Sequence, residues 1–183
     1  MKFTPTNLEG CYVIEPKVIS DERGYFMESF NEKTFQEAIN QEVHFVQDNQ
    51  SFSTKGVLRG LHYQTEEHSQ AKLVSVLSGE VLDVAVDIRS NSKTYGESVS
   101  VILSGTNKKQ FFIPRGFAHG FLVLSDTATF HYKCDNFYNK ESEGGIIYND
   151  ITLKIDWKLS NDALVISEKD RYLPSLENSK KIW

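Results

Sequence analysis

The sequence predicts an all-β fold with a few short helices, built as a sandwich or a barrel. Short apolar runs of Val, Leu, Ile and Phe recur through the middle of the chain, and turn residues separate them. Within 81–89 the side chains of Leu82, Val84 and their even-numbered neighbours fall on one face, while Asp83 and Asp87 fall on the other. Many short strands are typical of sandwiches and barrels, and this period alone does not separate a jelly roll from an immunoglobulin-like sandwich.

The strands are expected to follow one another closely. Apolar or alternating runs occupy 72–77, 81–89, 98–104, 110–114, 120–124 and 127–134. Between the first two runs, Ser78-Gly79-Glu80 is a hairpin signal. Pro114-Arg115-Gly116 and Ser125-Asp126 mark later turns.

Helical signals are few. Asn31 can cap a short helix that carries Phe35, Ala38 and Ile39 on one stripe. The tail after Pro174 is expected to add another turn or two.

Length and composition indicate one globular domain over residues 1–183. The net charge of −5 argues against general binding to nucleic acids or membrane surfaces, because both require an excess of basic charge. The first residues contain no signal-peptide core, and no apolar run approaches the roughly 20 residues of a membrane span. Two cysteines far apart suggest no disulfide framework, so we expect a protein of the reducing cytoplasm.

The first candidate for chemistry is His62, in the run Val57-Leu58-Arg59-Gly60-Leu61-His62-Tyr63-Gln64. Strict alternation places Leu58, Gly60, His62 and Gln64 on one face and Arg59 on the other, although a bulge at Gly60 would turn Arg59 inward as well. A lone His in such a run is more often structural. A role as a base requires a near-neutral pKa and a partner that fixes the tautomer.

His119 closes the pattern Pro114-x-Gly116-x-x-His119, which resembles the second half of the cupin signature. This resemblance implies a jelly-roll barrel. In metal-binding cupins this His is a ligand, but the first half of the signature then reads His-x-His with a downstream Glu. The corresponding stretch here is His62-Tyr63-Gln64, so the sequence predicts no metal site.

Three further residues have both a structural and a functional interpretation. Lys72 precedes a Val-rich strand and is either a solvated Lys or a cation that points into a cavity. Tyr132 shares an inward face with Phe130 and Cys134, where a core Tyr is the common case. Asp170 ends Ser167-x-x-Asp170, which is also a helix-capping pattern.

Taken together, these residues resemble the dTDP-4-dehydrorhamnose 3,5-epimerase family of dTDP-sugar epimerases. The resemblance runs almost from end to end, and the blocks Leu58 to Gln64 and Pro114 to Phe121 are its most specific parts. The other blocks are Asp21 to Glu28, Gln47 to Ser51, Asp83 to Arg89 and Ser167 to Asp170.

The resemblance implies a role for each matching residue. His62 is the general base, Asp170 pairs with it, Tyr132 is the acid and Lys72 stabilises the enolate. Tyr138 matches the aromatic residue that stacks on thymine. The implied substrate contacts are Arg23, Glu28, Gln47, Asp48, Asn49, Arg59, Lys72, His119, Tyr138, Glu143 and Lys169.

The resemblance also implies the reaction and the partners. The expected reaction is epimerisation of dTDP-4-dehydro-6-deoxy-D-glucose at carbons 3 and 5 to dTDP-4-dehydro-L-rhamnose, in rhamnose and polysaccharide biosynthesis. It needs neither a metal nor a bound cofactor. The family forms homodimers in which residues matching Arg23 and Glu28 reach the partner's site.

Three alternatives remain open at this point. Relatives that epimerise carbon 5 alone, or act on another nucleotide 4-keto sugar, share most of these residues. A metal-dependent cupin enzyme would contain stoichiometric metal and lose activity with a chelator. A non-catalytic, sugar-binding jelly roll would bind the nucleotide sugar without exchanging its protons.

Overall fold

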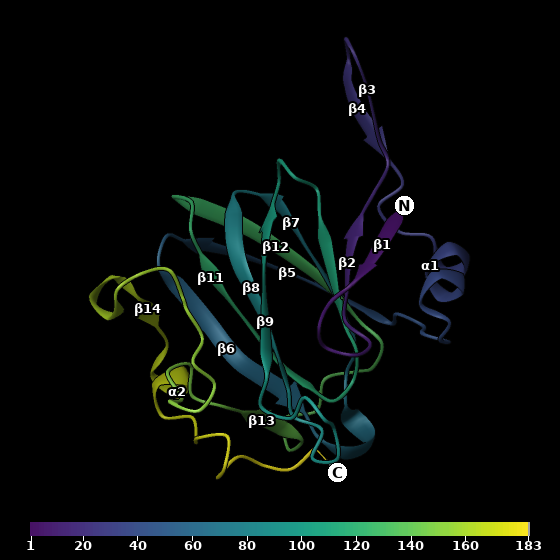
Figure 1. Cartoon of the computed structure of the whole chain (residues 1–183). Coiled ribbons are helices and arrows are strands. Elements are labelled where there is room, and N and C mark those ends of the chain that lie inside the picture. Colours follow the sequence, from purple (N-terminus) through teal and green to yellow (C-terminus); the bar gives the residue numbers. More distant parts are fainter. Residues whose placement is uncertain (183) are drawn as a thin grey trace.

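The computed structural model describes residues 1–182 and confirms the predicted jelly-roll barrel (Figure 1). Two sheets face each other and enclose the barrel interior, and in each the strand order differs from the sequence order. The first sheet has the order β1 (Lys2–Pro5), β2 (Tyr12–Glu15), β10 (Gln110–Ile113), β7 (Lys72–Ser78), β12 (Thr127–Cys134) and β5 (Gln47–Thr54). The second has the order β13 (Glu143–Gly145), β6 (Val57–Gln64), β11 (Phe117–Val123), β8 (Glu80–Asp87) and β9 (Ser98–Ser104), with β14 (Val165–Ile166) parallel to β6.

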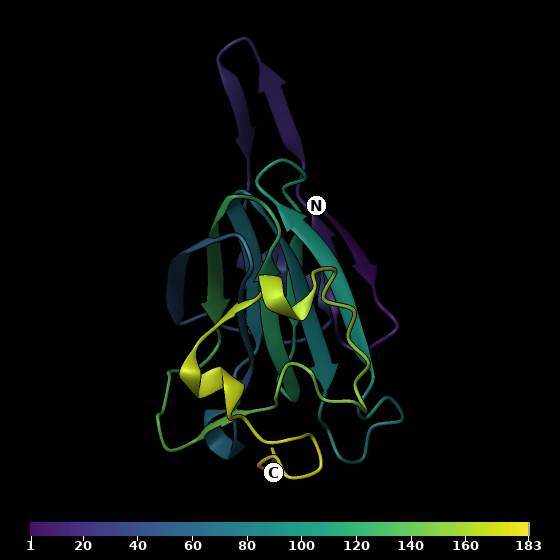
Figure 2. The same ribbon diagram turned by 90° about the vertical axis from the view of Figure 1, so that its left-hand side faces the viewer.

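A separate hairpin projects from the body of the barrel. It consists of β3 (Val18–Asp21) and β4 (Gly24–Met27), which pair only with each other. Figures 1 and 2 both show it standing clear of the two sheets. Its tip is therefore remote from the interior of its own barrel.

The helical elements are short and lie outside the barrel. Asn31 caps α1 (Glu32–Ile39) by accepting a hydrogen bond from the Thr34 N–H, and Phe35 and Ile39 are buried, as predicted. Ala38 is exposed, so it does not belong to the buried stripe. The second helix, α2 (Glu168–Arg171), begins at the capping pattern of Ser167. After Pro174 the described residues form hydrogen-bonded turns over 175–179 but no helix. Two 3₁₀ turns cover Glu66–His68 and Asn161–Ala163.

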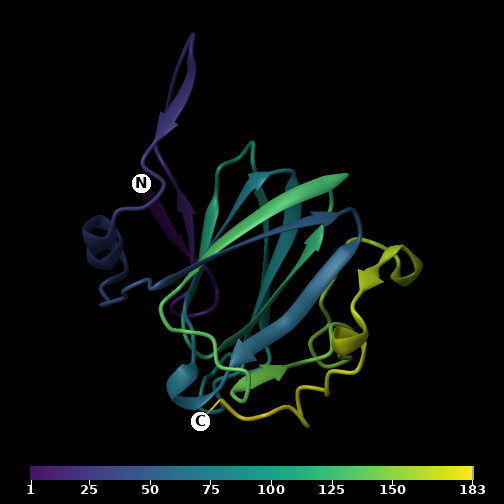
Figure 3. The ribbon, with the colours of Figure 1, turned by 180° about the vertical axis from the view of Figure 1, so that it is seen from behind.

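Strand β8 shows why the sequence alternates so regularly. Its even-numbered apolar residues, such as Leu82 and Val84, pack in an outer core together with Ile146 and Trp157 of the C-terminal segment. Its odd-numbered residues face the barrel interior, where Ala85 belongs to the core between the sheets. Figure 3 shows the C-terminal segment along the outside of β6, on the opposite side of the molecule from α1.

The prediction of a hairpin at Ser78-Gly79-Glu80 is wrong. Strand β7 pairs with β10 and β12, whereas β8 pairs with β11 and β9 in the other sheet. Gly79 has φ +81°, and a Cβ there would lie 2.0 Å from the carbonyl oxygen of Thr127. The turn is thus as tight as its sequence indicates, but it carries the chain from one sheet to the other.

Candidate active site

A break in the alternation of β6 brings two polar side chains into the barrel. Gly60 has φ +120°, and its α-carbon packs so closely on β11 that a Cβ would lie 2.6 Å from Cα of Gly120. The register of β6 against β11 shifts at this point. As a result Arg59 and His62 both line the pocket, which is the bulged arrangement rather than strict alternation. Leu58 packs in the outer core and also contributes to the pocket lining.

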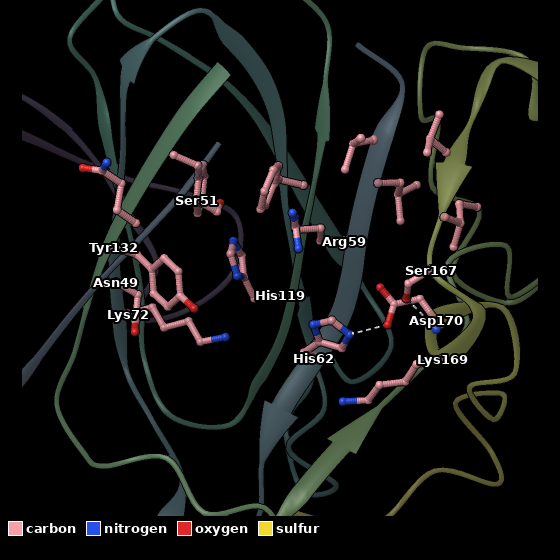
Figure 4. Close-up of a pocket in the computed structure, with 17 residues that line it drawn as sticks. Asn49, Ser51, Arg59, His62, Lys72, His119, Tyr132, Ser167, Lys169 and Asp170 are labelled. Carbon is pink, nitrogen blue, oxygen red and sulfur yellow. Dashed lines mark hydrogen bonds and ion pairs between the residues drawn. The ribbon is translucent and has the colours of Figure 1, made fainter. Parts of the chain in front are cut away.

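The pocket lies between the two sheets and has a volume of about 610 Å³. The first sheet contributes Asn49, Ser51, Lys72 and Tyr132 to its wall, and the second contributes Arg59, His62 and His119 (Figure 4). Four residues to which the resemblance gives a role, His62, Lys72, His119 and Tyr132, are therefore brought together. Groups from opposing sheets can reach opposite faces of one ligand.

His62 is paired with Asp170 of α2. The distance from His62 Nε2 to Asp170 Oδ1 is 2.7 Å, and Gly60 N–H donates to Oδ2 at 3.2 Å. Burial alone would raise the pKa of Asp170, but these hydrogen bonds and the charge of His62 lower it overall. An Nε2–H bond to an ionised carboxylate leaves the lone pair on Nδ1, and the other ring nitrogen faces the pocket in Figure 4.

The sequence Ser167-x-x-Asp170 both caps a helix and supplies the carboxylate that pairs with His62. Ser167 Oγ accepts the N–H of Asp170 at 3.1 Å and so caps α2. The same short helix directs the Asp170 carboxylate at His62, where it is 3% exposed. The capping pattern thus fixes the carboxylate that pairs with His62.

Lys72 and Tyr132 lie across the pocket from His62 (Figure 4). Lys72 Nζ is 5.9 Å from the centre of the Tyr132 ring. Burial lowers the pKa of Lys72, and burial raises the pKa of Tyr132, so the phenol keeps its proton at neutral pH. The wall opposite the His therefore holds a proton donor and an amine.

His119 is buried deeper in the barrel and pairs with Asp83. Its Nε2 lies 3.1 and 3.0 Å from the two carboxylate oxygens of Asp83. Burial lowers the pKa of His119, and the carboxylate opposes this effect. Its ring stacks on Phe130 at a centroid distance of 6.0 Å, and Phe130 stacks on Phe121 at 4.1 Å.

A second lobe of about 320 Å³ continues the site toward the barrel rim. It shares Asn49, His62, Lys72 and Tyr132 with the first lobe. At the rim Glu143 accepts from Lys169 Nζ at 2.5 Å and from Tyr138 Oη at 3.3 Å. The further residues of this lobe include Gln47, Tyr138 and Glu143.

The chain is similar in sequence to proteins of known function. The family profile described as dTDP-4-dehydrorhamnose 3,5-epimerase matches residues 5–178. The dTDP-4-dehydrorhamnose 3,5-epimerase of Shigella flexneri is 56% identical over 170 residues, which cover 93% of both chains. The chain belongs to the dTDP-4-dehydrorhamnose 3,5-epimerase family. It is accordingly an enzyme of the isomerase class.

Solved structures of the dTDP-4-dehydrorhamnose 3,5-epimerase family share the whole fold. The crystal structure of the enzyme from Elizabethkingia anophelis superposes with a TM-score of 0.95 at 57% identity, covering 100% of this chain and 99% of that one. A second structure, dTDP-6-deoxy-D-glucose-3,5-epimerase from Legionella pneumophila in complex with dTDP-4-keto-L-rhamnose, has a TM-score of 0.93 at 53% identity. It covers 97% of this chain and 93% of that one.

Three residues expected from the epimerase resemblance lie outside this pocket. Arg23 is at the tip of the β3–β4 hairpin, where it bonds the side chain of Asp21, and Glu28 follows β4 and accepts from Asn31 at 3.3 Å. Asp48 is on the opposite face of β5 from Asn49. Its carboxylate accepts from Lys133 Nζ at 3.0 Å, so the structure does not bring it to the substrate pocket of this chain.

Further residues of this epimerase line the pocket without a role assigned to them from the sequence, although Phe130 and Cys134 were predicted to face inward with Tyr132. Ser51, Phe121 and Phe130 line the first lobe, and Cys134 lines the second. Ser51 shares the alternation of β5 with Asn49, and Phe130 shares that of β12 with Tyr132, so of these two strands only β12 contained the signal in its apolar period.

Within residues 1–182 no group of three or more His, Cys, Asp and Glu side chains is arranged to hold a metal ion. Within the same range no helix is both long and apolar enough to cross a membrane.

Proposed function

We propose that the chain converts dTDP-4-dehydro-6-deoxy-D-glucose to dTDP-4-dehydro-L-rhamnose by inverting carbons 3 and 5. The observation that carries this proposal is the His62–Asp170 pair at 2.7 Å on one wall of a pocket whose opposite wall holds Tyr132 and Lys72. A carbonyl at carbon 4 acidifies the hydrogens on both neighbouring carbons. Their removal therefore requires only a base and a stabilised enolate, without a redox cofactor.

His62 is the base in this mechanism. Asp170 holds its Nε2–H and stabilises the imidazolium that forms when the other nitrogen takes a proton from the sugar. The negative charge then grows on the oxygen at carbon 4. A protonated Lys72 stabilises this charge more strongly in the transition state than in the ground state.

Tyr132 is the acid. Inversion requires that a proton return to the face opposite the one from which it left. Tyr132 is on the sheet opposite His62 and keeps its proton at neutral pH because burial raises its pKa. The two sheets of the barrel thus supply the two faces of the reaction.

The remaining polar residues hold the nucleotide diphosphate and the sugar. Arg59 suits the phosphate oxygens because its planar guanidinium donates several hydrogen bonds at once. Tyr138 is 54% exposed at the rim, where its ring is available to stack on thymine. The other proposed substrate contacts are Gln47, Asn49, Lys72, His119, Glu143 and Lys169.

A homodimer completes the site in this proposal. The β3–β4 hairpin exposes Ile19, Tyr25 and Phe26, and Phe26 is 69% exposed. A two-stranded hairpin with this much apolar surface is marginally stable alone, so packing on a second copy would stabilise it. Arg23 and Glu28, which lie away from their own pocket, would then contact the substrate of the partner.

We also propose that residues 1–183 form one domain that works in the cytoplasm. The three packed cores share strands of the same two sheets, which supports a single unit. Cys11 and Cys134 are both buried and free, which suits a reducing compartment.

Solvent deuterium incorporation tests the reaction. The protein is incubated in deuterated water with a panel of dTDP-4-keto sugars, and NMR follows each position next to the carbonyl. The proposal requires exchange at both carbon 3 and carbon 5 of the 6-deoxy-glucose substrate, with inversion at both. Exchange and inversion at carbon 5 alone would instead identify a 5-epimerase. Binding without exchange would identify a sugar-binding protein, and loss of exchange on adding a chelator would identify a metal-dependent enzyme.

A further inference from the structure

A carboxylate without a role in the proposed chemistry is buried directly behind the site. Asp83 of β8 is 0% exposed and faces the barrel interior. Both of its oxygens lie within 3.1 Å of Nε2 of His119 on the neighbouring strand β11. A buried carboxylate is costly unless nearby groups compensate it, so its neighbours indicate what it does.

Lys72 is the second group that senses this carboxylate. Burial lowers the pKa of Lys72, and negative charge on Cys134, Asp83 and Glu143 opposes that effect. Burial raises the pKa of Cys134, so at neutral pH it is an uncharged thiol that cannot compensate the amine. Glu143 pairs with Lys169 at the rim. Asp83 pairs with His119 and with no lysine or arginine in the described part of the chain, and His119 lines the same pocket as Lys72. The negative charge of Asp83 is therefore the one left to act on Lys72.

Other titratable and charged groups face Lys72 and His119 from four neighbouring strands. They are Tyr132 and Cys134 of β12, Asp83 of β8, Glu143 of β13, and Arg59 and His62 of β6. Lys169 and Asp170 of α2 line the same pocket. His62 and Lys72 both lower the pKa of His119, which adds to the effect of burial. A neutral His119 that donates Nε2–H to Asp83 keeps the lone pair on Nδ1.

We propose that Asp83 is a positioning residue whose charge keeps Lys72 in the ammonium form and whose carboxylate fixes the proton of His119 on Nε2. The inference rests on the proposed function for the use of that ammonium group, which stabilises the enolate oxygen. Asp83 itself touches no substrate atom in this arrangement, because His119 lies between it and the pocket. Asp83, on the sheet opposite the strand of Lys72, thus sets the charge of the amine that stabilises the enolate oxygen.

Asp83→Asn tests the charge while keeping an acceptor for the Nε2–H of His119. The rate of deuterium exchange is measured from pH 6 to pH 10 in the wild type and the variant. Removal of a negative charge near an ammonium group favours loss of its proton, so the alkaline limb of the profile should move to lower pH by about one unit or more. The matched control is Asp87→Asn, on the same strand and face, whose buried carboxylate bonds Arg89 instead of the site. Asp87→Asn should leave the alkaline limb of the exchange profile at the same pH as in the wild type.

An unshifted limb in Asp83→Asn, with a uniform loss of activity at every pH, would overturn the inference and leave Asp83 a structural residue. The proposed function is tested independently, because it fails only if the wild type itself exchanges no deuterium. If Asp83→Asn does not fold, NMR of the wild type tests the inference instead. NMR of ¹³C-labelled lysine and ¹⁵N-labelled histidine at neutral pH should show an ammonium group at Lys72 and Nε2–H at His119. A neutral amine or the Nδ1–H tautomer would equally overturn the inference.

Discussion

Replacing Tyr132 by Phe should separate the two proton transfers of the reaction. The substitution deletes the phenolic proton donor and keeps the ring, which packs 5.9 Å from Phe130 and 5.9 Å from Lys72 Nζ. His62 and Asp170 are on the other side of the pocket and are unchanged. The enolate should therefore still form, but the proton can return only to the face from which it left.

The expected size follows from the role of a positioned acid. Loss of such a group slows the step that it catalyses by roughly 10²–10⁴-fold, or about 2.7–5.5 kcal/mol of transition-state stabilisation. Inversion at carbon 5 should fall by this amount in Tyr132→Phe. Exchange at the same carbon should stay within about tenfold of the wild type, because base and enolate stabilisation are retained.

The assay is deuterium wash-in by NMR, with product stereochemistry measured on the same samples. The control for stability is the thermal midpoint of the variant, which should change little because the ring contacts remain. Equal losses of exchange and inversion would refute the assignment of the two faces. Tyr132 would then be a residue that positions the substrate or belongs to the base machinery.

The other predictions concern the base, the diphosphate and a buried carboxylate. His62→Gln, which can still donate to Asp170, should lose exchange and inversion together by roughly 10²–10⁴-fold, and retained exchange would assign the base elsewhere. Arg59→Ala should weaken dTDP binding by about ten- to a hundredfold in calorimetry, and added salt should weaken dTDP binding by the wild type. Unchanged dTDP affinity in both Arg59→Ala and Arg23→Ala would show that neither arginine binds the diphosphate. At Asp87, burial raises the pKa, but hydrogen bonds from its neighbours outweigh it and lower the pKa to about 2. Because that value is below the unfolded one, the stabilisation is present at neutral pH and lost as pH falls from about 4 to 2. Urea unfolding should show Asp87→Asn less stable by roughly 2 kcal/mol at pH 7, and a gap that persists at pH 2 would contradict the assignment.

Local sequence predicted what depends on local spacing. The alternation of β8 was predictable because each face packs on a different core, and Asn31 was predictable as a cap because its side chain bonds an N–H three residues on. The sequence did not predict which sheet the chain enters after a turn. Ser78-Gly79-Glu80 encodes a tight turn, but whether the next strand stays in the same sheet depends on contacts with strands far along the chain.

The site shows the same division. The alternation of β5 separates Asn49, which lines the pocket, from Asp48, which does not. The sequence predicted neither this strand nor the separation, because the run Gln47–Thr54 is polar on both faces and shows no apolar period. The pairing of His62 with Asp170 could not be predicted from spacing, because 108 residues separate the two, and it was expected only from the family resemblance. The bulge at Gly60 was foreseen as one option, and the close approach of Gly120 decides it.

The position of Asp170 late in the chain has a consequence for the order in which a new molecule becomes active. Every strand from β1 to β13 is synthesised before α2, so a nascent chain has His62 in place well before its carboxylate partner exists. Asp170 reaches the site only when the C-terminal segment docks on the outside of β6, through β14 and the outer core. A chain in which the C-terminal segment is not docked would therefore have His62 without the carboxylate that holds its Nε2–H.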